Sequence, residues 1–376
     1  MDTYVMSREE LVSYQLRTLY SRYGYSQYKM SKFEEYDLYV RNKNFLVSDN
    51  VITFTDHSGR LLALKPDVTL SIVKSGRNVP GKVSRIYYNE NVYRTVPGSR
   101  DFREITQIGL ECIGELDTYL VSEVLTLAAK SLKRAGRYIS SFQSPDYVLE
   151  LSHLDVVSCL LDSLTVNDEV KGELLRCIGE KNVHDMARIC REAGADEARA
   201  CALQTLITTY GTPDEVLPVL SALSRENEAL REPTEELTQT IDALPDEVRE
   251  RVRLDFSLLN DMTYYNGIVF RGYIKGIPDG VLSGGRYDRL MRKMNRRSDA
   301  LGFAVYLDRL AGYYTTAPGE LYDTVLLYDD ATSPRKLSEW VEKRVAEGER
   351  AVAVRDIPGN WHYKEVIDMR GGNGDA

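Results

Sequence analysis

Long apolar runs, paired cysteines and histidine clusters are all missing from this 376-residue sequence. No segment approaches the roughly 20 apolar residues of a membrane-spanning helix, and the start, MDTYVMSREE, lacks the basic and apolar regions of a secretion signal. The five cysteines are scattered and never spaced as CxxC, so neither a disulfide framework nor a zinc site is indicated. Only four histidines occur, so no metal site is expected. We therefore expect a cytoplasmic protein without membrane contacts.

Three common catalytic motifs are missing as well. The chain has no GxxxxGK[ST] phosphate loop, no GxSxG nucleophile elbow and no GxGxxG dinucleotide fingerprint. Acidic residues exceed basic ones by 57 to 48, and this balance argues against non-specific nucleic-acid binding, because phosphate contacts need a surplus of Lys and Arg. The overall acidic balance does not exclude a local basic groove. With 43% hydrophobic residues, the chain is long enough for two or three packed domains.

The first part of the chain combines helix-like and strand-like segments. Apolar residues recur at helical spacing over Ser7–Tyr23, with Ser7 as the cap, and again over Asp117–Gly136. Strand patterns, separated by turn signals, are VITFTD, RLLALKPD, SRIYYNENVYR, FREITQIGLECIG and DYVLELS. This order predicts an α+β fold, an antiparallel sheet flanked by helices.

A helical stretch from about Leu154 to Arg251 interrupts the strand patterns, which resume at VRLDFSLL. Because strand signals bracket it, we interpret this stretch as an insertion into one domain. The end of the chain reads as strand, helix, strand, and GGNGDA is expected to be disordered. The predicted divisions are 1–153 and 252–316 for the two parts of the core, 154–251 for the insertion, and 317–376 for a small, incomplete α/β segment.

Four polar clusters lie inside strand-like segments, where polar residues are normally scarce. The first, KPDVT, is by itself best explained as a strand end with Asp67 or Thr69 capping the next helix. The second is RTVPGSRDFREITQIGLE, two strands around a Pro-Gly turn. Because successive side chains of a strand point to opposite faces, the second strand places every other residue on one face. These residues are Arg103, Ile105, Gln107, Gly109 and Glu111. That face suits an exposed hairpin and a polar site about equally.

The third cluster is LLNDMTYYNGIVFRGYI, an expected strand over Leu258–Ile274 that sets Asn260 and Thr263 beside two tyrosines. The fourth is SGGRYD, Ser283–Asp288. A Gly-Gly pair in a strand marks a bulge or a ligand close to the backbone, and a plain turn is an equal alternative. The Asp-Arg pair in GFAVYLDRL, taken alone, is typical of a solvated ion pair at a strand-to-helix junction.

In this order the clusters resemble the core of the class II aminoacyl-tRNA synthetases, and most closely the histidine–tRNA ligase branch. RLLALKPDVTLSIVK is similar to the LRPEGT segment of that family, and VYRTVPGSRDFREITQIGLECIG resembles motif 2. MTYYNGIVF and SGGRYD resemble the histidine-specific segments, and GFAVYLDRL resembles motif 3. The resemblance covers roughly Met6–Ala311. It implies an antiparallel sheet with flanking helices that forms dimers.

The sequence departs from the ligases where they carry out chemistry. The ligases read RGLDYY in the histidine-specific segment, but here Asn260 replaces the arginine and Thr263 replaces the aspartate. Motif 2 keeps Arg94, yet Thr95 and Val96 follow it in place of a glutamate that contacts ATP. Adenylate formation needs such charged groups, and losing one typically costs a few kcal/mol. The resemblance therefore implies a chain that does not catalyse ligation.

The parts that hold histidine in the family are better preserved. Carried over position by position, they are Asp67, Thr69, Arg94, Gln107, Glu111, Tyr264, Tyr265, Gly284 and Gly285. Carboxylates can pair with an ammonium group and accept from an imidazole N–H, while tyrosines pack against the ring. A pocket that binds an amino acid without activating it is a sensor.

Fewer than 60 residues follow Pro318, too few for the complete anticodon-binding domain of the ligases. In this respect the chain is similar to the regulatory-subunit family of ATP phosphoribosyltransferase. That resemblance implies L-histidine as effector, the short-form catalytic subunit as partner and a homodimer within a hetero-oligomer, with no cofactor and no tRNA. An active histidine–tRNA ligase is the alternative. A different ligand is another, because Asp67 is one methylene shorter than the family's glutamate.

Overall fold

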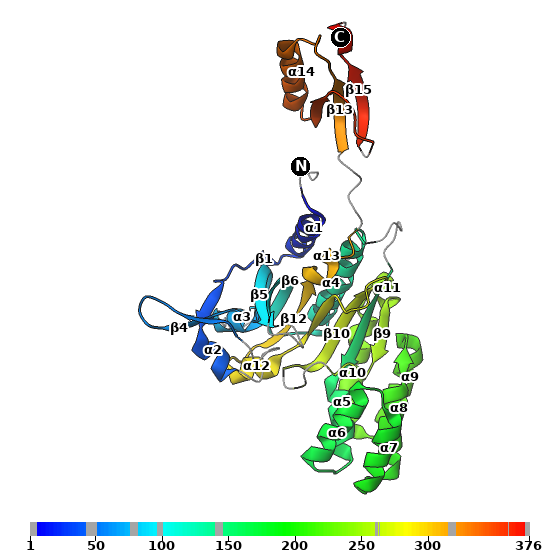
Figure 1. Cartoon of the computed structure of the whole chain (residues 1–376). Helices are drawn as coiled ribbons and strands as arrows, with labels where there is room; N and C mark the ends of the chain where they lie inside the picture. Colours follow the sequence, from blue (N-terminus) through cyan, green and yellow to red (C-terminus); the bar gives the residue numbers. More distant parts are fainter. Residues whose placement is uncertain are drawn as a thin grey trace. The chain divides into compact units, whose positions relative to one another are not determined.

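The computed structural model describes residues 6–42, 51–75, 82–95, 101–139, 146–259, 262, 264–314, 321–359 and 361–372. The chain forms two compact units, Met1–Tyr314 and Thr315–Ala376, which are labelled by element in Figure 1. No helix among the described residues is long and apolar enough to cross a membrane.

The first unit is built on one large sheet, to which the described residues contribute nine strands in the order β1-β5-β6-β12-β11-β10-β7-β9-β8. From β5 to β7 every neighbouring pair is antiparallel, whereas β1 pairs with β5 and β7 with β9 in parallel. The predicted antiparallel sheet is therefore confirmed for its centre. The strands are β1 Ser26–Gln27, β5 Ser84–Thr95, β6 Phe102–Gly114, β7 Tyr147–His153, β8 Tyr210–Gly211, β9 Val252–Asp255, β10 Asn266–Ile274, β11 Leu282–Arg286 and β12 Asp299–Tyr306.

Helices α1 (Arg8–Arg22) and α4 (Thr118–Gly136) cover one face of this sheet (Figure 1). Both begin where the sequence predicts, because the Ser7 hydroxyl accepts from the Glu10 amide and the Asp117 carboxylate accepts from the Leu120 amide. Alternate residues of β6 point into the same apolar core: Ile108, Leu110 and Cys112. Since strand side chains alternate, Gln107 and Glu111 must point to the opposite face.

The opposite face carries smaller elements. They are α2 (Tyr36–Arg41), α3 (Thr69–Ser75), α12 (Asp288–Lys293) and a three-stranded antiparallel sheet of β2 (Phe33–Glu35), β4 (Leu61–Leu64) and β3 (Thr53–Thr55). A second apolar core joins α3, α12 and β12 through Leu70, Leu290 and Ala300. Helix α3 starts two residues after Asp67, and α12 starts directly after Tyr287. This arrangement brings the first and fourth polar clusters of the sequence to the same side of the sheet.

Mainly helices lie between β7 and β9, in the stretch that the sequence analysis interprets as an insertion. Its helices are α5 Leu154–Ser163, α6 Asp168–Gly179, α7 Val183–Glu192, α8 Glu197–Thr208, α9 Pro213–Glu226, α10 Arg231–Asp242 and α11 Asp246–Arg249. Pro213 lies in the first turn of α9 and Pro233 in the first turn of α10, where a missing backbone N–H breaks no helical hydrogen bond. The short strand β8 lies inside the insertion and pairs with β9, so the insertion also extends the sheet.

The C-terminal unit contains β13 (Leu321–Leu327), α14 (Pro334–Ala346), β14 (Ala351–Val354) and β15 (His362–Asp368). Its three strands form a parallel sheet in the order β14-β13-β15. The sequence predicts the first strand, the helix and the second strand. It does not reveal β15, because this edge strand is mostly exposed and carries His, Lys, Glu and Asp instead of an apolar pattern. Of the GGNGDA end that was expected to be disordered, Gly371 and Gly372 belong to a short 3₁₀ helix, Arg370–Gly372, and residues 373–376 lie outside the described residues.

One expectation about a strand is wrong, and two of the alternatives for the Gly-Gly pair are excluded. The strand predicted from Leu258 begins only at Asn266; within its first residues the pairing register with β11 shifts between Asn266 and Val269, and Gly267 has a φ of +60°. Asn260, Asp261 and Thr263 lie outside the described residues. The Gly284-Gly285 pair forms neither a bulge nor a turn, because both residues pair in regular register within β11.

Candidate functional site

A small cavity of about 90 Å³ opens on the sheet face opposite α1 and α4. It is lined by Asp67, Val68, Thr69, Tyr88, Arg94, Gln107, Glu111, Tyr264, Tyr265, Ser283, Tyr287, Gly302, Phe303, Ala304 and Tyr306. Of the nine residues carried over from the resemblance, all but Gly284 and Gly285 are in this lining. Two parts of the chain that the insertion separates therefore meet in one pocket.

Glu111 lies at the centre of the pocket and is 2% exposed. Its Oε1 accepts a hydrogen bond from the Thr69 hydroxyl at 2.9 Å, and its Oε2 accepts one from the Tyr287 hydroxyl at 2.7 Å. Burial raises the pKa of Glu111 to about 8, although the two hydroxyl hydrogen bonds oppose that rise. A carboxylate offers about four acceptor positions, so a ligand N–H can still be accepted.

Asp67 makes the helix-capping contact that its sequence suggested, and it also lines the pocket. Its Oδ1 accepts from the Leu70 amide at 2.8 Å at the start of α3, and its Oδ2 lies 3.7 Å from Nη2 of Arg94. Burial raises the pKa of Asp67, and the nearby guanidinium of Arg94 opposes the rise. Arg94 is held in place because its Nε donates to the Pro66 carbonyl at 2.7 Å. The pocket thus has one cation and two buried carboxyl groups.

Tyrosine rings form the walls. The ring centroids of Tyr264 and Tyr265 are 4.5 Å apart in an edge-on arrangement, and Tyr287 lies 6.0 Å from Tyr264. Tyr88 and Tyr306 complete the wall, but sequence reasoning did not find them. The signal for Tyr88 was its place opposite Gly109 across the β5–β6 hairpin, where an added Cβ would contact the Tyr88 hydroxyl.

Glycines beside the pocket leave room for the Glu111 carboxylate and for neighbouring aromatic rings. Gly302 lies opposite Glu111 in the β6–β12 pairing, and a Cβ at Gly302 would overlap the Glu111 carboxylate. Gly284 and Gly285 have an indirect role. A Cβ on Gly285 would come within 2.7 Å of the Tyr265 ring, and one on Gly284 within 2.6 Å of the Phe270 ring. Gly285 thus lets the Tyr265 wall approach the sheet, whereas Gly284 makes room for Phe270 of the apolar core, and neither glycine is in the lining of the cavity.

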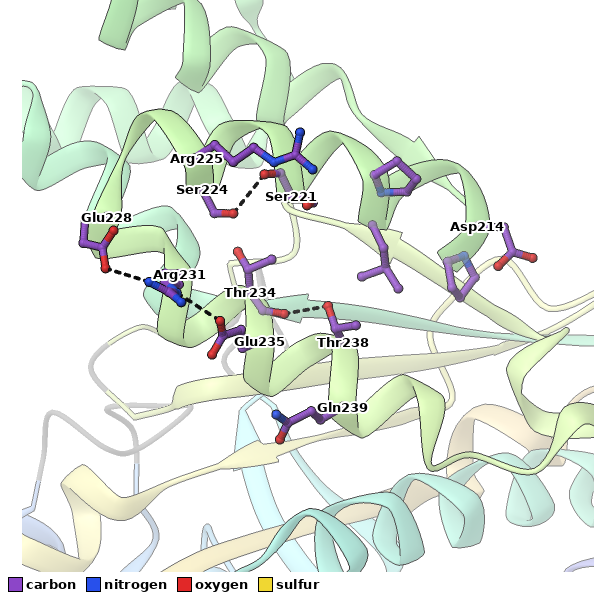
Figure 2. Close-up of a pocket in the computed structure, with 13 residues that line it drawn as sticks. Asp214, Ser221, Ser224, Arg225, Glu228, Arg231, Thr234, Glu235, Thr238 and Gln239 are labelled. Carbon is purple, nitrogen blue, oxygen red and sulfur yellow. Dashed lines mark hydrogen bonds and ion pairs between the residues drawn. The ribbon is translucent and has the colours of Figure 1, made fainter.

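A larger groove of about 770 Å³ runs between α9 and α10 of the insertion, and Figure 2 shows its lining. Its charged residues pair with one another, since Arg231 contacts Glu228 at 3.4 Å and Glu235 at 3.1 Å, all of them largely exposed. It lacks the buried carboxyl groups of the smaller pocket. Within the described ranges, no three His, Cys, Asp or Glu side chains are placed to hold a metal ion. The small pocket is therefore the better candidate for a specific ligand.

A mainly antiparallel sheet, a strand hairpin with Arg94 at its tip and a carboxylate pocket walled by tyrosines define a core of the class II aminoacyl-tRNA synthetase type. Residues 5–310 match the family model described as histidyl-tRNA synthetase. A protein of Geobacillus thermodenitrificans named ATP phosphoribosyltransferase regulatory subunit is 30% identical over 94% of this chain and 90% of its own length. The relative of the same name from Oceanobacillus iheyensis is 27% identical over 81% of this chain and 73% of its own.

Among solved structures, a Bacillus halodurans protein described as an ATP phosphoribosyltransferase regulatory subunit/histidyl-tRNA synthetase is similar, with a TM-score of 0.77 and 25% identity. The likeness covers 97% of this chain and 94% of that one. The chain therefore belongs to the histidyl-tRNA synthetase family and, within it, to the ATP phosphoribosyltransferase regulatory subunits.

Proposed function

We propose that this chain is a non-catalytic regulatory subunit that binds L-histidine in the small pocket. In this proposal it assembles with the short-form ATP phosphoribosyltransferase catalytic subunit, which it activates, and makes the first step of histidine biosynthesis sensitive to histidine. We expect it to act in the cytoplasm, as a homodimer within the hetero-oligomer. The observation that carries the ligand assignment is Glu111, a buried carboxyl group with acceptor capacity left over, enclosed by tyrosines.

The pocket matches histidine group by group. Asp67 and Glu111 can each hold a positively charged or N–H donating group, which suits an ammonium and an imidazole. Arg94 supplies the cation that an α-carboxylate requires, and the tyrosine faces suit a flat ring. The cavity of about 90 Å³ is smaller than the roughly 300 Å³ at which drug-sized pockets begin, so it favours a small ligand over a drug-sized one.

Calorimetric titration of the purified full chain tests the ligand. Binding of L-histidine is expected, while Glu111→Gln should weaken it, because the amide presents less acceptor capacity and no charge. Glu104→Gln, an exposed change on the same strand, is the matched control and should leave the affinity unchanged. A thermal-shift series over the other amino acids identifies a different ligand if one raises the melting temperature more than histidine does. Absence of histidine binding would refute the assignment.

Co-purification with a short-form catalytic subunit tests the partner. The regulatory role predicts a stable complex whose phosphoribosyl-transfer activity needs this chain and falls when histidine is added. With Glu111→Gln the complex should still form, yet inhibition should require a higher histidine concentration. A catalytic subunit that is equally active and equally inhibited without this chain would contradict the proposal.

A further inference from the structure

A network of charged side chains lies beside the pocket, centred on Arg286 at the end of β11. Its guanidinium contacts Asp288 at 2.6 Å, Glu236 at 3.1 Å and Asp299 at 3.1 Å. The Arg286 side chain is 20% exposed, so water screens these contacts only in part. Arg286 thus forms ion pairs with three carboxylates, and a small rotation of its side chain can strengthen one ion pair and weaken another.

The network reaches the pocket through the backbone. Tyr287, whose hydroxyl donates to Glu111, lies between Arg286 and Asp288 in the sequence. Asp288 is fixed on the sheet side, because its Oδ1 accepts from the Ala300 amide at 2.9 Å. The Tyr287 amide donates to the Ala300 carbonyl at 2.8 Å. A displacement of Tyr287 relative to Glu111 therefore also moves Arg286, the preceding residue.

The network ends on the insertion. Glu236 belongs to α10, and its Oε2 lies 3.3 Å from Nε2 of His153 at the end of β7. His153 is fully buried, and its Nδ1 finds no hydrogen-bond partner among the described residues. Glu236 therefore connects α10 to β7 through His153 and to β11 through Arg286.

We propose that occupancy of the pocket is transmitted to α10 through the segment Arg286–Asp288, with the Arg286–Glu236 ion pair as the contact that carries it. The inference rests on the proposed function, since it takes histidine as the ligand that acts on Glu111. A ligand N–H accepted at a remaining acceptor position of Glu111 turns the carboxyl group toward the ligand, so the Tyr287 hydroxyl bonded to Oε2 moves with it. In this proposal that movement shifts the backbone at Tyr287 and redistributes Arg286 among its carboxylates. The position of α10 then depends on whether the pocket is filled.

Hydrogen exchange of the full chain, read by mass spectrometry with and without saturating L-histidine, tests this transmission. We expect histidine to change the exchange rates of α10 amides by about fivefold or more, the lower end of typical couplings between sites. Exchange in α7, which lies in the same insertion but has no part in the network, should stay the same. In Glu236→Gln the α10 response should be lost.

The control is Glu235→Gln. It removes a neighbouring carboxylate of the same helix that pairs with Arg231 and not with Arg286, so it should keep the α10 response. Tyr287→Phe tests the other end, because it removes only the hydroxyl and should also abolish the response. Calorimetry on every variant separates the two proposals. If histidine binds but α10 does not respond, or responds equally in Glu236→Gln, the transmission is refuted while the proposed function stands. If histidine does not bind, both are refuted.

Discussion

Replacing Glu111 by glutamine should make the ligand-free protein more stable, by an amount that depends on pH. Burial holds the pKa of Glu111 at about 8, against 4.5 for a free carboxyl group. Between these two values the folded chain keeps a proton that the unfolded chain has lost. The free energy of unfolding therefore falls as the pH rises through this window.

The magnitude follows from the size of the pKa shift. At 1.36 kcal/mol per pKa unit, the displacement from 4.5 to about 8 corresponds to about 5 kcal/mol, nearly all of it lost by pH 8. Glutamine has no such transition, yet its amide can still form hydrogen bonds with the hydroxyls of Thr69 and Tyr287. The gain in stability from Glu111→Gln should thus be about 1 kcal/mol at pH 5 and roughly 4 kcal/mol at pH 8.

Urea unfolding of both proteins at pH 5, 6, 7 and 8, followed by circular dichroism without histidine, measures this difference. Other titrating groups are common to both proteins and cancel in the comparison. A difference that stays constant across the range would show that Glu111 is ionised in the folded state at every pH, and would refute the reasoning. If the difference grows with pH as predicted, the natural carboxyl group is retained at a cost to stability, as expected for a binding residue.

Three further predictions concern the pocket. Gly302→Ala should lower histidine affinity at least tenfold, because its methyl group would overlap the Glu111 carboxylate; calorimetry showing unchanged affinity would contradict this geometry. Arg94→Ala should weaken the binding of histidine by about tenfold but leave the binding of histidinol, which has no carboxylate, nearly unchanged. Equal losses of affinity for both ligands would place the ligand carboxylate elsewhere. Histidine-dependent pyrophosphate exchange should be absent, given Asn260 and Thr263 in place of the ligase Arg and Asp, whereas clear exchange would restore the ligase alternative.

The sequence predicts those parts of the fold that local patterns determine. Helices α1 and α4 follow from apolar spacing and from caps that act within one turn. The face shared by Gln107 and Glu111 follows from the period of two. The alternative between an exposed hairpin and a polar site was resolved only by the pairing of β6 with β12 and by the position of α3.

Features that depend on distant pairing could not be predicted. Gly302 makes room for Glu111 because the two residues lie opposite each other in neighbouring strands. Tyr88 lines the pocket from its position opposite Gly109. The start of β10 depends on the register shift at Gly267, which a pattern of alternating residues does not show. The resemblance named seven of the fifteen lining residues, because it carried three-dimensional neighbours along with the motifs. It placed Gly284 and Gly285 in the lining too, although their role is to let aromatic rings approach the sheet.

The pairing of β6 with β12 also bears on how the chain is made. Partners such as Glu111 and Gly302 are about 190 residues apart, so a ribosome working at 5–20 residues per second leaves the β5–β6 hairpin without this neighbour for roughly 10–40 s. During that interval one edge of β6 and its apolar face are open to other chains, a known route to aggregation. The helices of the insertion can form meanwhile from local contacts. A ligand of the small pocket, by contrast, can stabilise only a chain synthesised past Tyr306, the last residue of the lining along the chain.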